Sequence, residues 1–325
     1  MTRARFVALA LGVAGLLAAV GCAGSGAVLR AIDHVGLLGL IVIAVIHVPA
    51  ITSMGLAWAL LGGAGEGGGW WKFIGARYVR DATAEVLPFS QLGGLLGGAR
   101  ALSLSGLGAI AVMSSAFGDV LIEQLAKLPY VLGGVSLLLE IRHGAVPLVW
   151  LAYTVLPMSL VMIFAVVYRH GVLSLLERGA RALVRLFPRL RFQSLDSLRP
   201  AIERVMTLDR RTVGAFALHL LAWVLGAAET WVTFRFIGVP LDSARALILD
   251  SLYCGLRTFG FAVPAALGVQ EAAYALLGTL LGIPLAASVA FSLIRRVRDV
   301  LIGVPGLGAW QVLEGRRALA RASRP

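Results

Sequence analysis

Two segments, one in each half of the chain, combine charged side chains with proline and small residues inside apolar surroundings. The first has the sequence Glu85-Val-Leu-Pro88-Phe-Ser-Gln91-Leu-Gly93-Gly94 and continues to Arg100, and the second runs from Arg257 through Pro264 and Gly268 to Gln270 and Glu271. Carboxylate and guanidinium groups bind charged headgroups, and amide side chains add neutral hydrogen bonds. Because charges are costly at bilayer depth, these side chains need either a ligand or a partner there.

Matched pairs of Pro/Gly-interrupted apolar segments are typical of a transporter's binding site near the bilayer midplane. We therefore predict a polar cavity lined by these two segments. The candidate contacts for a lipid headgroup are Glu85, Gln91, Arg100, Arg257, Gln270 and Glu271, and the candidate re-entrant turns contain Pro88, Gly93, Gly94, Pro264 and Gly268. A structural interpretation stays open, because small residues at four-residue spacing serve helix packing and buried Arg–Glu pairs neutralise one another.

Sequence signatures of hydrolases and metalloenzymes are absent. The chain has no GxSxG, HExxH or DxD pattern, and its two cysteines and five histidines are scattered. Asp119 and Glu123 resemble paired carboxylates, but Lys127 on the same helical face predicts local neutralisation. Asp119 also fits a helix N-cap. We expect no catalytic residue, no metal and no cofactor.

The composition places these residues in a membrane protein. Hydrophobic residues make up 59% of the 325 residues and charged residues 14%, whereas soluble domains carry roughly 25% charged residues. A soluble fold of this length has no place for so much apolar surface, but a bilayer removes the difficulty. We predict a single all-α membrane domain over residues 1–325, a polytopic bundle of about six to eight helices.

Uncharged stretches predict the individual elements. Crossing helices are expected over 6–29, 35–61, 147–168, 212–236 and 272–294, with shorter apolar runs over 101–118 and 300–312 and a charged helix over 119–140. Pro49 is expected to kink its helix, and Pro305-Gly306 to interrupt the last run. The first stretch follows a basic start and also fits a signal peptide, although its length favours an uncleaved helix.

The net charge of +12 comes almost entirely from arginine. The basic residues flank apolar spans, which is the positive-inside pattern and not a nucleic-acid-binding one. Residues 169–211 hold ten arginines and predict a cytoplasmic loop that either binds anionic headgroups or only sets topology. Both termini should share the cytoplasmic side with this loop, which requires an even number of full crossings.

Four sequence motifs resemble the membrane-domain family of lysylphosphatidylglycerol synthases and flippases. They are the Glu85–Gly94 core within Arg77–Arg100, Gly98-Ala-Arg-Ala-Leu102, Pro264-x-x-x-Gly268-x-Gln270-Glu271, and Pro305-Gly-x-x-Ala-Trp310. Within this family the chain is most similar to the hopanoid-associated HpnL group. Ala265-Ala266 depart from the glycines that often follow the proline in the family.

The resemblance implies an all-helical protein of the bacterial inner membrane with re-entrant segments. It also implies movement of polar lipids, hopanoid-type or related, between leaflets or toward the outer envelope. The family's aminoacyl-transferase domain needs several hundred further residues, so we do not expect lipid aminoacylation by these 325 residues. Two alternatives remain: a non-catalytic scaffold for lipid-biosynthesis partners, and an intramembrane lipid transferase. The oligomeric state is not predicted.

Overall fold

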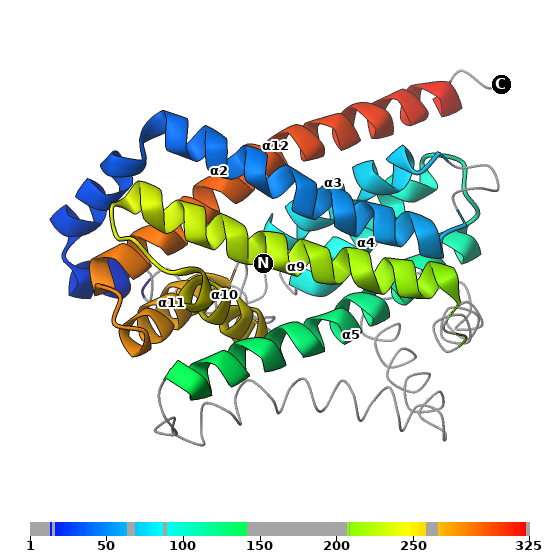
Figure 1. Cartoon of the computed structure of the whole chain (residues 1–325). Coiled ribbons are helices and arrows are strands. Elements are labelled where there is room, and N and C mark those ends of the chain that lie inside the picture. The colour runs from blue at the N-terminus through cyan, green and yellow to red at the C-terminus, as the bar shows by residue number, and fades with distance from the viewer. Residues whose placement is uncertain are drawn as a thin grey trace.

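The computed structural model describes residues 14, 17–63, 69–86, 90–141, 207, 209–257 and 266–322, and all regular secondary structure in these ranges is α-helical. Three of the described helices are long and apolar enough to cross a bilayer: α2 (Ser25–Leu61), α5 (Ala109–Ile141) and α9 (Arg210–Ile237). The other labelled helices are α3 (Trp71–Val86), α4 (Ser90–Ser103), α10 (Ser243–Arg257), α11 (Val269–Leu280) and α12 (Leu285–Ala322) (Figure 1). The chain is thus the all-α membrane bundle that its sequence predicts.

Several predicted elements lie outside the described residues. They are the helix over 147–168, most of the arginine-rich loop over 169–211, and the beginning of the first apolar stretch. The predicted spans over 35–61 and 212–236 are confirmed within α2 and α9. In α2 the backbone leaves helical geometry at Gly36 (φ 56°, ψ −176°) and not at Pro49, because glycine lacks the Cβ that opposes positive φ.

α2 and α9 pack side by side in antiparallel directions (Figure 1). A Cβ added at Gly39 of α2 would lie 3.1 Å from the ring of Phe236, near the end of α9. At the other end of the pair, a Cβ added at Gly214 of α9 would lie 3.1 Å from Leu60 of α2. Two of the candidate membrane spans therefore approach closely through glycine, as membrane helices commonly do.

Local chemistry fixes both ends of α9. The Asp209 carboxylate accepts a hydrogen bond of 2.7 Å from the Thr212 N–H, and this bond holds the pKa of Asp209 below its usual value. Gly238 ends the helix in the left-handed region, with φ 83°. These signals agree with the predicted span.

Two predictions about the last third of the chain were wrong. The expected helix over 272–294 is two helices, because α11 ends at Leu280 and Gly282 turns the chain with φ 73° just before Pro284. The expected break at Pro305 does not occur, and α12 continues through it to Ala322. Proline is tolerated in membrane helices when neighbouring helices support the chain, and here α12 packs on α2 and α3.

A third correction concerns the middle of the first half. The short span over 101–118 and the helix over 119–140 are largely one helix, α5, which follows a turn around Gly106 (φ 91°). Asp119 therefore lies inside α5 and is not an N-cap. Its side chain is fully buried, which requires a partner.

The described helices form two units, and in each unit a long helix is followed by two short helices and a second long helix. In the first unit, α2 to α5 have 37, 16, 14 and 33 residues. In the second unit, α9 to α12 have 28, 15, 12 and 38 residues. Packing follows the same equivalence, because α12 lies on α2 and α3 while α5 lies on α9 and α10. With α2 antiparallel to α9, the two units are related as an inverted pair.

Each unit contains an apolar core. The core of the first unit includes Trp58, Phe73, Leu102 and Val112, and that of the second includes Phe234, Leu249, Tyr274 and Phe291. Trp58 and Phe73 pack edge to face, with ring centroids 6.1 Å apart. Phe234 and Phe291 stack at 4.8 Å. Such contacts add to the apolar area buried; the first holds the short helix α3 against α2, and the second joins the long helices α9 and α12.

Candidate functional site

The ends of α3 and α10 meet in an ion pair between Glu85 and Arg257. Glu85 lies one residue before the end of α3, and Arg257 is the last residue of α10, so each precedes one of the predicted broken segments. Their side chains are 24% and 32% exposed. Asp299 and Tyr253 also interact electrostatically with Arg257. The structure therefore brings together two predicted contacts that are 172 residues apart.

Glu271 is fully buried and serves the fold at the start of α11. One carboxylate oxygen accepts a hydrogen bond of 2.6 Å from Nε of Arg296, and the other accepts the Gly268 N–H at 2.8 Å. Arg296 also donates to the carbonyl of Ala266 at 3.2 Å. Glu271, the third residue of α11, thus caps the N-cap N–H of its own helix, which anchors the helix after the second broken segment.

Gln270 and Arg100 occupy other surroundings. The buried Gln270 accepts a hydrogen bond of 2.8 Å from the Tyr253 hydroxyl and donates to the Ser292 carbonyl at 3.0 Å. Arg100 is 44% exposed and binds Glu314 of α12 through two hydrogen bonds of 2.6 and 2.7 Å. The Arg100–Glu314 pair ties α4 to α12 on the surface and is separate from the Glu85–Arg257 pair.

The predicted turn residues are only partly described. Pro88, Pro264 and the side chain of Gln91 lie outside the described part of the chain. Gly268 has φ 76° and stands at the N-cap position of α11, where the chain enters the helix. A side chain there would be strained, since positive φ disfavours every residue with a Cβ.

Gly93 and Gly94 lie inside α4 and not in a turn. A Cβ added at Gly94 would lie 2.7 Å from the carbonyl oxygen of Arg80 in α3, and one added at Gly97 would lie 2.4 Å from the Thr83 hydroxyl. The glycines therefore allow α3 and α4 to pack with their backbones in close approach. This placement matches the helix-packing interpretation of the small residues.

A buried charge network joins α3, α5 and α9, and we call it the first network. It consists of Arg77, Arg80, Asp119, Glu123 and His219, each less than a tenth exposed. Arg80 donates to Asp119 at 2.6 Å and to Glu123 at 2.7 Å. Arg77 binds Glu123 at 2.9 Å. Nε2 of His219 lies 2.9 Å from the Asp119 carboxylate.

The two arginines of the first network are the close neutralising partners of its two carboxylates. Lys127, which the sequence spacing favours for that role, donates to Gln124 at 3.2 Å. Its Nζ also lies 4.9 Å from the ring centroid of Trp223. Helical spacing therefore predicted the shared face of α5 correctly, but the charges that meet this face come from α3.

A second network joins α2, α9, α10 and α12. Its charged or titratable members are His47, Glu229, Asp250, Arg295 and Arg298. Glu229 lies 2.6 Å from Nδ1 of His47 and 3.0 Å from Nη1 of Arg298. Arg295 donates to Asp250 at 2.6 Å. The second network thus holds two compensated Arg–carboxylate pairs inside the bundle.

The two networks occupy equivalent places in the two units with opposite signs. In the first, the cations lie on the short helix α3 and the anions on the long helix α5. In the second, the anion Asp250 lies on the short helix α10 and its cation on the long helix α12. Each network also takes a histidine from the long first helix of the other unit. The Arg–carboxylate pairs of each network therefore lie within one unit, and each network reaches the other unit through its histidine. The partly exposed Glu85–Arg257 pair joins the two units where the broken segments begin.

Comparison with known proteins gives one family match. A family model described as Lysylphosphatidylglycerol synthase TM region matches residues 5–306. The matched range includes both broken segments and both buried networks. Comparisons with curated proteins and with solved structures found no match.

Proposed function

This chain belongs to the family of the lysylphosphatidylglycerol synthase TM region, and on that premise we propose that it moves a polar lipid between the two leaflets of its membrane. The family and the apolar helices assign it to membrane lipid biology. The finer proposal, transport, is supported chiefly by one observation: the Glu85–Arg257 ion pair links the two inverted units at the starts of their broken segments.

Physical chemistry connects this pair to lipid movement. A lipid headgroup needs a polar path across the hydrocarbon region while its tails stay in lipid. Glu85 and Arg257 are both partly exposed, whereas Glu229 and Arg298 of the second network are almost completely buried. A charged headgroup can reach the Glu85–Arg257 pair because part of each side chain is exposed, whereas the fully buried pairs are closed to it. The accessible pair is therefore the natural place for headgroup exchange.

The cargo and setting complete the proposal. We propose a hopanoid-type or other amphiphilic lipid as cargo, consistent with the sequence resemblance to the HpnL group. The chain would lie in a bacterial inner membrane with both termini in the cytoplasm, and it would act without covalent chemistry on the lipid. Anionic headgroups would bind its arginine-rich region, most of which lies outside the described residues.

The test measures lipid movement in proteoliposomes that contain a polar lipid with a fluorescent headgroup. Accessibility of the label to a membrane-impermeant reductant reports the leaflet. The wild-type chain should raise the flip rate above that of empty vesicles, and Glu85→Gln or Arg257→Gln should return it toward the empty-vesicle rate. The proposal is abandoned if the wild-type chain moves none of the labelled phospholipid and hopanoid analogues.

A matched control separates transport from folding. Arg100→Gln removes another arginine from an exposed ion pair, the one with Glu314, and should keep the transport rate. The double exchange Glu85→Arg with Arg257→Glu rebuilds the pair with its charges reversed and should restore the fold if a single variant harms it. Equal transport by wild type and both single variants would instead indicate a scaffold role for the pair.

A further inference from the structure

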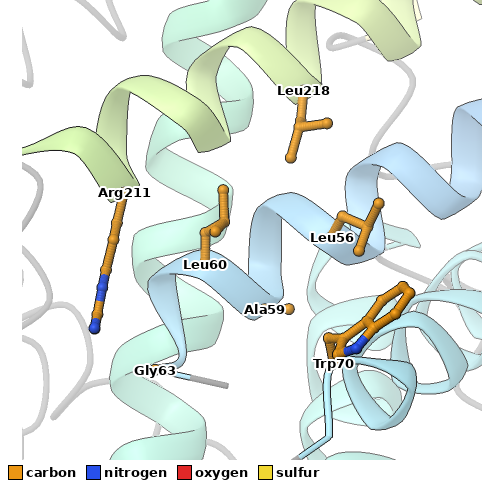
Figure 2. Close-up of a pocket in the computed structure, with 7 residues that line it drawn as sticks. All are labelled: Leu56, Ala59, Leu60, Gly63, Trp70, Arg211 and Leu218. Carbon is orange, nitrogen blue, oxygen red and sulfur yellow. The ribbon is translucent and has the colours of Figure 1, made fainter. Parts of the chain in front are cut away.

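A separate cavity of about 380 Å³ lies between the end of α2 and the start of α9 (Figure 2). Its lining residues are Leu56, Ala59, Leu60, Gly63, Trp70, Arg211 and Leu218. The volume is more than ten times the roughly 30 Å³ that a water molecule occupies in the liquid. Because most of the wall is aliphatic, the cavity suits hydrocarbon better than water.

Arg211 is the charged side chain among the residues that line this cavity. Figure 2 shows Arg211 extending from α9 past the aliphatic side chains, with Trp70 on another wall. Trp70 is 57% exposed, and Arg211 is also exposed. Arg210 adds a second exposed cation next to the rim but does not line the cavity. Asp209, a neighbouring carboxylate in the described part of the chain, accepts the cap hydrogen bond from the Thr212 N–H and also interacts electrostatically with Arg211.

The position of the cavity along the helices identifies its surroundings. α2 ends at Leu61 and α9 begins at Arg210, and both helices are candidate membrane spans. The cavity mouth therefore lies at the level where spans leave the hydrocarbon. Tryptophan is enriched at this level, and arginine near it attracts anionic lipids. An amphiphile from the bilayer meets both an aliphatic wall and a cation here.

We propose that this cavity binds one acyl chain of an anionic phospholipid, whose phosphate pairs with Arg211. The aliphatic wall contacts the hydrocarbon, and the guanidinium donates hydrogen bonds to two phosphate oxygens through its fork of N–H groups. The site lies away from the Glu85–Arg257 pair and does not depend on transport. It would hold a resident lipid against the packed ends of α2 and α9.

The experiment is native mass spectrometry of the delipidated full chain in detergent, titrated with phosphatidylglycerol or with phosphatidylcholine of the same acyl chains. One phosphatidylglycerol should bind at the lowest concentration, ahead of the graded series of weaker adducts. Arg211→Gln should weaken the first binding about fivefold, the loss expected for one basic residue near an anionic group. Arg210→Gln, the matched control, should leave the first binding within about twofold of wild type.

A second variant tests the cavity independently of charge. Leu60→Trp fills the space from a position that is 36% exposed and should remove the first bound lipid while Arg211 stays in place. Equal affinity for the two phospholipids, or an unchanged first binding in Leu60→Trp, would overturn the proposal. Binding that follows only the total arginine number, with Arg210→Gln as damaging as Arg211→Gln, would also overturn it. A lipid-binding result of either kind leaves the flip-rate test unaffected.

Discussion

At the residue scale, the fold contains ion pairs between buried side chains. Glu229 is 2% exposed and lies within hydrogen-bonding distance of His47 and Arg298, and its second carboxylate oxygen has no partner in the described structure. Removing one partner of such a pair leaves an uncompensated charge in an apolar interior. The cost of that state exceeds the net contribution of the intact pair.

We therefore expect Arg298→Met to destabilise the protein strongly, by about 3–5 kcal/mol. Replacing both partners, Arg298→Met with Glu229→Leu, should recover much of this loss because the buried carboxylate is then removed together with its guanidinium, and Asp299, which also contacts Arg298, is 22% exposed. Thermal unfolding in detergent measures both effects. Arg245→Gln is the control, since its pair with Asp242 is half exposed and should contribute less than about 1 kcal/mol. A double variant as unstable as the single one would contradict the argument.

Residue types and spacing predicted some of these roles and not others. Glu85 and Arg257 were identified from their segments, and they meet in the structure. Glu271 was identified by the same pattern, yet it caps α11 and binds Arg296. A glutamate three residues after a glycine fits both roles, so only the partner decides between them. The partner is a property of the fold and is not present in the local sequence.

At the element scale, the glycines of α4 permit its close approach to α3. Gly94 faces the Arg80 carbonyl of α3, and the backbone cannot rotate away as a flexible side chain can. Gly75 of α3 also lies inside a helix, but a Cβ there would meet nothing within 4 Å. These two glycines have the same helical context and opposite surroundings.

Gly94→Ala should therefore destabilise the protein by about 1–3 kcal/mol, since α4 must move off α3. Gly75→Ala should stabilise it by about 0.5–1 kcal/mol, since alanine is the better helix former and gains no clash. Chemical unfolding of the two variants in the same detergent gives the comparison. Equal effects of one sign would show that helix propensity, and not the approach of α3 and α4, governs these positions.

Hydropathy predicted the long elements and missed the turns made only of uncharged residues. The spans in α2 and α9 could be predicted because charged residues or glycines mark their ends in the sequence. The α11–α12 turn contains Gly282 and Pro284 but no charge, so the apolar run looked continuous. Conversely, Pro305 resembles a helix break, although α12 continues through it against α3. Tertiary packing decides such cases.

At the scale of the whole molecule, the inverted pairing of the two units is the property least visible in the sequence. The matched broken segments indicate two halves of the chain. The equivalence of α2 with α9 and of α5 with α12 is visible only from the packing of the helices. The opposite signs of the two networks also hide the relation, because equivalent positions carry different residues. The Glu85–Arg257 pair then lies where the two units meet through their short helices.

If transport requires the two units to move relative to each other, holding them together at this pair should stop it. We expect a short bifunctional thiol reagent to lock Glu85→Cys to Arg257→Cys and to abolish lipid movement in proteoliposomes. Cys22 and Cys254, the two cysteines of the sequence, are first replaced by serine and alanine. The uncross-linked double variant lacks the charges, so its residual flip rate is the baseline for comparison.

A control lock joins Arg100→Cys to Glu314→Cys, which links α4 to α12 on the surface and away from the proposed headgroup path. Because α12 belongs to the second unit, this lock also restrains relative motion of the units. Loss of transport by both locks would indicate that unit motion is required, and loss by the first alone would indicate blockage of the headgroup path. Full transport by the Glu85–Arg257 lock, with cross-linking verified by peptide mass, would exclude both roles for the pair and return it to a purely structural one.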